Sequence, residues 1–144
     1  MEIKRTTSTN SVIYDDAVAI RLAVFVQEQG VPQKLELDGN DAIATHYVGY
    51  VDEQPVVTLR TTPSDDLLHI QRVATVKTAR HHGYAAELMT AVIDQARATA
   101  EYSIAYLGAQ LHAKTFYAGL GFKAQGATFM EAGIEHQEMA IALK

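Results

Sequence analysis

One stretch of the chain, from Val73 to Met89, combines a strand, a polar loop and an amphipathic helix. The strand is rich in Val, Thr and Ala, and a polar loop over residues 77–83 follows it and ends in Gly83. Beyond the loop, apolar side chains recur at the spacing of a helix with one apolar face. They are Ala85, Leu88, Met89, Val92 and Ala96. A strand that leads through a short loop into such a helix predicts an α/β fold, in which the helix packs back on a sheet.

The start of this helix has the chemistry of an anion site. The first N–H groups of a helix lack intrahelical acceptors and carry a partial positive charge, which suits a diphosphate. Gly83 removes a side chain where an anion must approach, Ala85 keeps the next turn small, and Arg80 adds positive charge. On spacing alone, an ordinary turn with a glycine is the better interpretation. Neither the Walker pattern nor the three-glycine dinucleotide fingerprint is present.

The remaining segments predict a central mixed sheet with helices on its faces, the α/β (α+β) class. Helical spacing of apolar residues favours a first helix over Tyr14–Val26, capped by Ser8, Thr9 or Asn10, and a polar loop is expected over Gln33–Asp41. Strands are expected at 3–6, 45–51, 56–61, 67–76, 104–108, 122–129 and 137–143, and a short helix at 113–120. No repeat or flexible linker divides the chain, so residues 1–144 are interpreted as one domain.

Composition narrows the possible chemistry. The chain has no Cys, which excludes disulfides, thiolate metal sites and a cysteine nucleophile. Its net charge is −5 and its 12 basic residues are scattered, so we expect no nucleic-acid partner. No signal-peptide block and no apolar run of ~20 residues occurs, so a cytoplasmic protein without a membrane partner is expected. The six histidines form no H-E-x-x-H or similar pattern, and no metal site is expected.

Several separated segments resemble the GNAT superfamily of acyl-CoA-dependent N-acetyltransferases and follow the family's order. Residues 80–85, Arg-His-His-Gly-Tyr-Ala, match its R-x-x-G-x-G/A signature. Residues 21–32, 41–46, 70–74 and 108–122 are similar to segments of a bacterial subgroup of small, single-domain members. The resemblance covers nearly the whole chain. It implies a mostly antiparallel sheet in which two parallel strands, here 67–76 and 104–108, splay apart to admit the pantetheine arm of acetyl-CoA.

The resemblance also implies which residues contact this cofactor. Backbone groups of Val73, Ala74 and Thr75 would meet the pantetheine amides, and the N–H groups of residues 80–85 would cradle the pyrophosphate. Gln110 stands where many members of the family carry an Asn that reaches the pantetheine. The full implied set is Val73, Ala74, Thr75, Arg80, His81, His82, Gly83, Tyr84, Ala85, Gln110, Ala113, Phe116 and Tyr117.

Tyr117 is the residue that the resemblance places beside the thioester sulfur. A phenol of pKa near 10 holds a proton at neutral pH and can donate it to the leaving thiolate as a general acid. The alternative is a core tyrosine on an amphipathic helix. With no Cys and no Ser/His/Asp arrangement, direct attack by the acceptor is expected rather than an acyl-enzyme.

The acceptor amine must lose a proton, because an alkylamine with a pKa of ~10.4 is only about one part in 10³ neutral at pH 7. His69 is a possible general base, although an exposed strand histidine is an equally good interpretation. His46 and a water chain are further candidates for this role. Glu28 and His46 are candidate substrate residues.

The expected function is transfer of the acetyl group to a primary amine of a small molecule or peptide. A non-catalytic module of the same fold that binds or senses acyl-CoA is the alternative, and a longer acyl donor is a third possibility. The acidic residues Glu36, Asp38 and Asp41 could line a substrate entrance, although such a run is more often a solvated loop. Arg60 and Arg72 could be their buried partners. Exposed edges of the last two strands suggest a homodimer.

Overall fold

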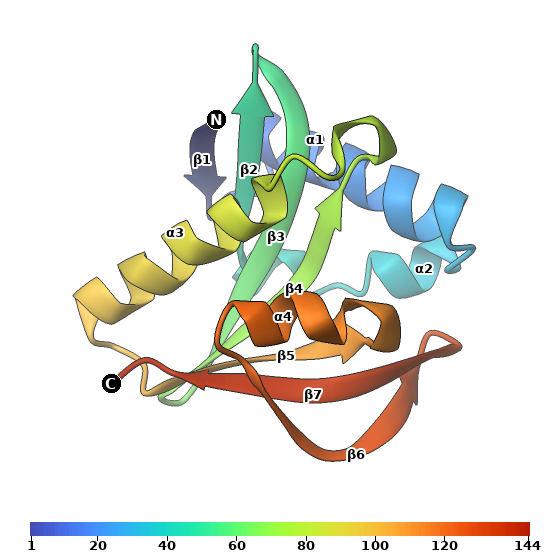
Figure 1. Cartoon of the computed structure of the whole chain (residues 1–144). Helices are drawn as coiled ribbons and strands as arrows, with labels where there is room; N and C mark the ends of the chain where they lie inside the picture. The colour runs from blue at the N-terminus through green and yellow to red at the C-terminus, as the bar shows by residue number, and fades with distance from the viewer.

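A computed structural model describes residues 1–144 and shows one seven-stranded sheet in the order β1-β2-β3-β4-β5-β7-β6 (Figure 1). The β4–β5 pair is parallel and every other pair is antiparallel. This confirms the predicted mixed, mostly antiparallel sheet. The strands are β1 (Glu2–Thr6), β2 (Thr45–Val51), β3 (Gln54–Ser64), β4 (Leu67–Thr75), β5 (Ile104–Gln110), β6 (Lys123–Glu131) and β7 (Ile134–Ala142).

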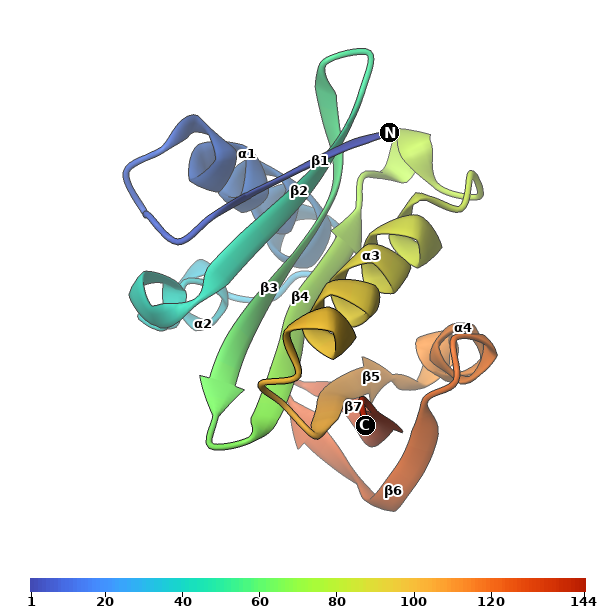
Figure 2. The same ribbon diagram turned by 90° about the vertical axis from the view of Figure 1, so that its left-hand side faces the viewer.

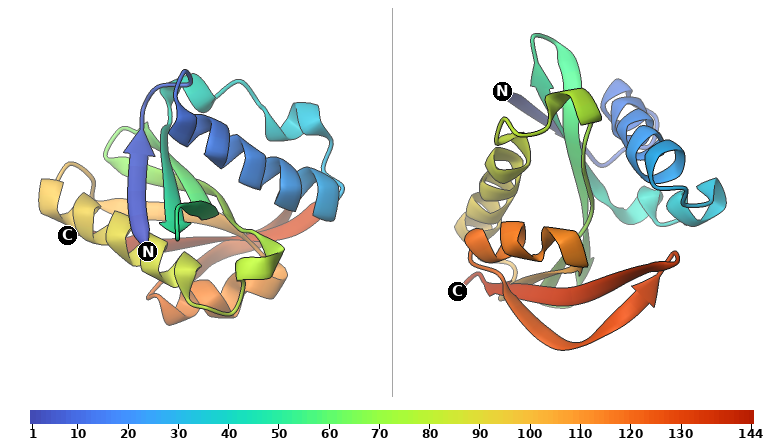
Figure 3. Two further views of the ribbon diagram at one scale, coloured as in Figure 1. Left: turned by 90° about the horizontal axis from the view of Figure 1, so that it is seen from above. Right: turned by 45° about the vertical axis from the view of Figure 1, so that its right-hand side comes forward.

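Helices cover both faces of the sheet, as predicted. The helix α3 (Tyr84–Thr99) packs on one face and α1 (Val12–Arg21) on the other, as Figure 3 shows in its right-hand view. The larger apolar core lies under α3 and includes Leu88, Met89 and Val92. The smaller core lies under α1. None of the helices combines the length and the apolar character needed to cross a lipid bilayer.

The first helix differs from its predicted form. It begins at Val12 because the side chain of Ser11, rather than Ser8, Thr9 or Asn10, accepts the Tyr14 N–H at 3.2 Å. Its continuation, Leu22–Glu28, is a π-helix. Such wide turns are uncommon and occur often at functional sites. Here the wide turns carry the chain to the edge of the cleft described below.

The segment from Gln33 to Asp41 was predicted to be a loop, and this is partly wrong. It contains the short helix α2 (Gln33–Glu36) and leads into a 3-10 turn (Asp41–Ile43). Glu36 and Asp41 are buried rather than solvated. The segment is therefore held against the sheet by something stronger than local turn preference.

A charge network holds this segment in place. It consists of three guanidinium groups and three carboxylates, from Arg21, Arg60, Arg72, Glu36, Asp38 and Asp41. Five of its contacts are 2.8–2.9 Å long, and a sixth, from Arg72 to Asp38, is 3.2 Å. Arg60 and Arg72 are therefore the partners of these acids, as the sequence suggested. Because the charges balance, the acidic run offers no free carboxylate to an incoming amine.

The sheet opens between β4 and β5. Their parallel pairing covers only Leu67–His69 against Ile104–Tyr106, and beyond it the two strands diverge (Figure 2). A bulge in β4 coincides with the divergence: Gln71 pairs with Arg60, Ala74 pairs with Thr58, and the register shifts between them. Arg72 takes a positive φ of 59° within the bulge. Since this region is costly for a side chain other than glycine, the ion pairs of Arg72 help to stabilise it.

Candidate active site

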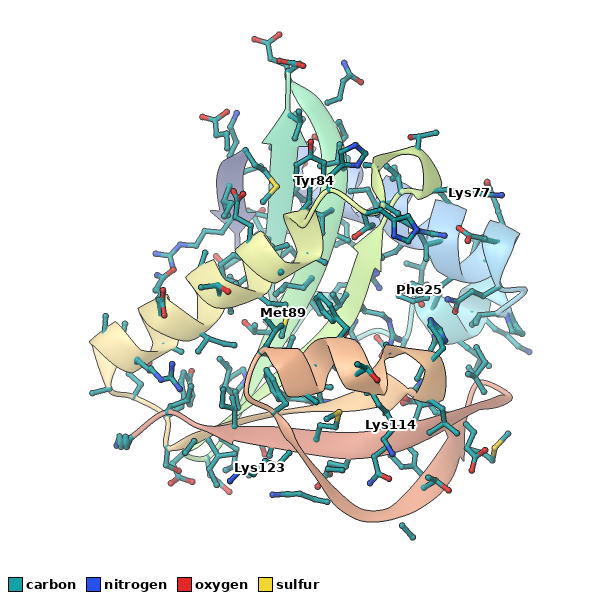
Figure 4. The ribbon with its side chains drawn as sticks, viewed as in Figure 1. Phe25, Lys77, Tyr84, Met89, Lys114 and Lys123 are labelled. Carbon is teal, nitrogen blue, oxygen red and sulfur yellow. The ribbon has the colours of Figure 1, made fainter.

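A cleft of about 890 Å³ lies where β4 and β5 separate. Its walls come from the π-helical segment, the segment 33–41, the loop before α3, the helix α4 (Lys114–Gly119) and the β6–β7 hairpin. Phe25, labelled in Figure 4, lines the cleft from the π-helical segment. Segments spread from Val24 to His136 therefore meet around one cavity.

The loop before α3 presents an array of unpaired backbone donors. Gly83 stands at the N-cap with a φ of 78° and a ψ of 10°, and no side chain caps the helix. The N–H groups from His81 to Ala86 have no acceptor within the chain, whereas that of Glu87 donates to the Gly83 carbonyl at 3.0 Å. Consecutive free N–H groups at a helix start form an anion site. The backbone here has the free donors that the pyrophosphate site implied by the resemblance requires.

The Arg80 side chain does not point freely into this array. Its guanidinium binds both carboxylate oxygens of Glu28 at 2.6 and 2.7 Å, and its Nε donates to the Thr75 carbonyl at 3.1 Å. The hydrogen bonds from Arg80 lower the pKa of Glu28. Glu28, a candidate substrate residue, is therefore occupied by Arg80, and the positive character of the loop comes from its backbone.

The other predicted cofactor residues fall into two groups. The side chains or backbone of Val73, Ala74, Thr75, Arg80, His81, Ala85, Gln110, Ala113, Phe116 and Tyr117 line the cleft. His82 and Tyr84 do not line it; their rings stack on each other with centroids 5.5 Å apart. Of the residues from His81 to Ala86, only His81 and Ala85 line the cleft itself.

Gln110 is engaged by a residue that the sequence did not single out. Its amide exchanges two hydrogen bonds with Gln29, at 2.9 and 3.4 Å. Gln29 follows the π-helical segment and Gln110 ends β5, so this pair joins two opposite walls of the cleft.

Tyr117 lies in α4 and lines the cleft while only 8 % of its surface is exposed. The rings of Phe116 and Phe122 meet it edge-on, with centroids 5.0 and 6.0 Å away. Burial raises the pKa of the Tyr117 phenol above its ordinary value of 10.0. The group therefore keeps its proton at neutral pH, as a general acid requires.

The two histidines proposed as bases lie in different places. His69 lines the cleft and stacks on Tyr106 with ring centroids 4.3 Å apart, and burial lowers its pKa. It is thus not the exposed strand histidine of the alternative interpretation. His46 is fully buried, with its Nε2 2.9 Å from the Asp41 carbonyl, and it does not line the cleft. The structure therefore separates His46 from the other candidates.

Sequence reasoning missed the contribution of the β6–β7 hairpin. Its Glu131, Ala132, Ile134 and His136 all line the cleft. Ala132 and Gly133 form a two-residue turn with φ values of 51° and 75°. Such turns are usually signalled by Asn-Gly or Asp-Gly, and the Ala-Gly pair here gave a weaker signal.

The sequence matches the family model described as "Acetyltransferase (GNAT) domain" over residues 7–143. The chain belongs to the GNAT acetyltransferase family. It is therefore an acyltransferase, and the splayed strands and free N–H groups are the parts of this GNAT chain that suit an acyl-CoA.

Individual proteins resemble this GNAT acetyltransferase over nearly their whole length. "Uncharacterized N-acetyltransferase YjcF" of Bacillus subtilis (strain 168) is 32% identical over 138 residues, which cover 95% of this chain and 98% of that protein. Escherichia coli ElaA matches with a TM-score of 0.86 and 28% identity, covering 97% and 99% of the two chains. An acyl-CoA N-acyltransferase from Pseudomonas aeruginosa matches with a TM-score of 0.84 and 26% identity, covering 96% and 97%.

Proposed function

We propose that this GNAT acetyltransferase transfers the acetyl group of acetyl-CoA directly to a primary amine of a small molecule or peptide. The observation that carries the proposal is that the loop with free N–H groups before α3 reaches one cleft through His81 and Ala85, and that this cleft also holds an unpaired strand edge and the buried Tyr117. Residues 1–144 would form a single catalytic domain. The three similar proteins are named as N-acyltransferases or share the same fold, which supports N-acyl transfer.

The cofactor would be held mainly by backbone groups. The pyrophosphate would accept hydrogen bonds from the N–H groups between His81 and Ala86. The pantetheine amides would pair with β4 at Val73–Thr75, where β5 no longer occupies the edge. The free edge of β4 would thus hold the pantetheine, and the start of α3 would hold the pyrophosphate that follows it in coenzyme A.

The chemistry would be a direct displacement. The neutral amine attacks the thioester carbonyl, the C–S bond breaks, and Tyr117 donates its proton to the departing sulfur. A buried phenol is suited to this step because it stays protonated at neutral pH. No covalent intermediate on the protein is involved.

The test is release of free thiol from acetyl-CoA across a panel of alkylamines, polyamines, amino sugars and N-terminal peptides, each compared with a reaction lacking the acceptor. The proposal predicts release that depends on one class of amine. Tight cofactor binding with no release from any acceptor would contradict catalysis and favour an acyl-CoA sensor. Absence of binding would contradict the proposed cofactor cleft itself.

We also propose that two copies of the chain associate along β6. This strand is at the edge of the sheet, and all nine of its residues are exposed. An unpaired strand edge favours association with another strand. Sedimentation at micromolar concentration should show a dimer, and a monomer would contradict this arrangement.

A further inference from the structure

The β6–β7 hairpin brings to the cleft a histidine and a carboxylate that have no role in the function proposed above. They are His136 on β7 and Glu131 at the end of β6, and both line the cleft. The Glu131 Oε2 lies 3.9 Å from the His136 Nε2, too far for a direct hydrogen bond. His136 is only 8 % exposed, while Glu131 is an exposed residue of the hairpin.

Local hydrogen bonding fixes the tautomer of His136. Its Nδ1 lies 2.7 Å from the Ile134 carbonyl oxygen. A carbonyl only accepts, so Nδ1 carries the hydrogen, and neutral His136 keeps its lone pair on Nε2. The ring also stacks on Phe129, with centroids 5.7 Å apart. His136 is therefore held as a proton acceptor with a defined orientation.

Gly108 on β5 leaves room for the Phe129 and His136 rings. A Cβ atom at this position would lie 3.1 Å from Phe129 Cζ and 3.9 Å from His136 Cδ2. Both Gly108 and His136 line the cleft. The absent side chain thus keeps the imidazole ring accessible from the part of the cleft where the strands diverge.

Glu131 is the carboxylate of the cleft wall that has no Arg or Lys partner. Glu28 is paired with Arg80, and Glu36 and Asp38 belong to the charge network. An ammonium ion entering the cleft would therefore be attracted to Glu131 rather than to the other acids. The segment from residue 24 to residue 38 also contributes the apolar side chains of Phe25, Val31 and Leu35 to the cleft. Together these side chains fit an alkylamine with an apolar body.

His69 is the rival base, and its surroundings suit the role less well. Neither of its ring nitrogens has a hydrogen-bond partner that would fix a tautomer. Burial lowers its pKa; the charge of Glu131 opposes this shift, and the charges of Arg60 and Arg72 reinforce it. Besides Glu131 and His136, the charged or titratable groups that line the cleft are Glu28, Glu36, Asp38, His69, Arg72, Arg80, His81, His112 and Tyr117.

We infer that His136 is the general base of the proposed reaction and that Glu131 binds the acceptor as its ammonium ion; this inference rests on the proposed function. The ammonium gives one proton to His136 Nε2, and the freed lone pair attacks the thioester carbonyl carbon. The C–S bond breaks, and the sulfur takes the proton of Tyr117. The second N–H proton of the adduct restores Tyr117 through solvent, and His136 releases its proton. The net products are an amide, a free thiol and one proton.

The test uses the full chain with 2-phenylethylamine as the acceptor, because this amine combines an ammonium with an apolar ring. His136→Asn keeps a donor for the Ile134 carbonyl but removes the base. We expect it to lower kcat/KM by about 100-fold at pH 7, to abolish the acid limb of the wild-type pH profile, and to leave the dissociation constant of acetyl-CoA unchanged. Glu131→Gln should raise the KM for the amine about tenfold with little change in kcat. Glu138→Gln, on an exposed part of β7 outside the cleft, is the matched control.

Wild-type kinetics in His136→Asn would overturn the base assignment, and an unchanged KM in Glu131→Gln would overturn the ammonium site. The second variant alters an exposed side chain, so it remains informative if the first fails to fold. If the wild type acetylates other amines but not 2-phenylethylamine, the inferred acceptor class is wrong while the proposed function stands. Failure with every amine would overturn the proposed function, and this inference with it.

Discussion

Tyr117 is the residue on which the proposed chemistry depends most directly. Replacing it with Phe keeps the ring that packs against Phe116 and Phe122 and removes only the buried hydroxyl. We expect kcat to fall by about 100-fold, the lower range for loss of a general acid, with little change in acetyl-CoA affinity. Steady-state kinetics and titration calorimetry measure the two quantities.

Tyr102→Phe is the control for that substitution, since Tyr102 packs against the same core and does not line the cleft. An undiminished kcat in Tyr117→Phe would refute the acid assignment. Equal losses in both variants would point to a packing effect instead.

Gly83 is the second residue whose identity the site requires. Its φ of 78° strains any other residue, but a Cβ there would meet nothing within 4 Å. We expect Gly83→Glu to abolish CoA binding, because its carboxylate would stand at the proposed pyrophosphate site. Calorimetric titration with CoA tests this.

Gly126 offers a matched control, with a φ of 70° and equally open surroundings on β6. Gly126→Glu should show a comparable backbone cost, about 1 kcal/mol, without loss of CoA binding. CoA binding by Gly83→Glu at wild-type affinity would show that the pyrophosphate does not bind at this turn.

At the scale of elements, the charge network ties the segment 33–41 to the bulge of β4. Arg72 contributes through contacts to Glu36 at 2.9 Å and to Asp38 at 3.2 Å. Its Nε faces Glu36 without the alignment of a hydrogen bond. We expect Arg72→Gln to lower the free energy of unfolding by about 2 to 3 kcal/mol, at the lower end of the cost of breaking a buried pair because the side chain is partly exposed.

Urea unfolding at pH 7 measures this loss, and Arg72→Lys should recover part of it because the positive charge remains. A change of less than about 0.5 kcal/mol, the size of an ordinary surface substitution, would mean that Arg72 does not stabilise the bulge.

The same elements should make the fold sensitive to acid in two steps. Burial lowers the pKa of His46 and of His69 in the folded chain. As the pH drops, these histidines therefore bind protons in the unfolded chain before they do so in the folded chain. The free energy of unfolding should fall as the pH drops below about 6.5. Burial alone would raise the pKa of Asp38 and Asp41, but hydrogen bonds from Arg60, Tyr14 and Arg21 hold both below the ordinary 3.8. Their contribution is present above that value and is lost as the pH falls through the lowered pKa values.

Thermal unfolding between pH 1.5 and pH 8 tests this pattern. His46→Gln should reduce the loss between pH 6.5 and pH 5, leaving the part due to His69, and should not affect the step below pH 4. An unchanged upper step in this variant would show that His46 is not held neutral in the folded state.

At the scale of the whole molecule, the features that depend on residues close together in the sequence could be predicted from it. The helical spacing of apolar residues predicted α3, and the turn glycine Gly83 indicated where this helix starts. The charge pattern suggested that Arg60 and Arg72 are partners of the acidic residues between Glu36 and Asp41. The resemblance supplied the splayed pair, and the pairing of β4 and β5 agrees with it.

The parts that depend on distant contacts were not predictable. Gln29 and Gln110 are 81 residues apart in the chain, and no local pattern shows that their amides meet. His136 belongs to no metal-binding or catalytic pattern in the sequence, so no local signal marks it. Its place in the cleft results from a two-residue turn and from Gly108 on a neighbouring strand. The proposed acceptor side of the cleft therefore forms only in the tertiary fold.

The most direct test of direct acetyl transfer is a single-turnover reaction with acetyl-CoA labelled in the acetyl group and an acceptor from the amine panel, stopped at successive times. Denatured protein and small molecules are separated and the label in each is counted. We predict that the label passes from CoA to the amine with no labelled protein at any time. Label that appears on the protein and then decays into the amine product would contradict direct transfer, and the absence of labelled amine would contradict the acetyltransferase function proposed for the cleft.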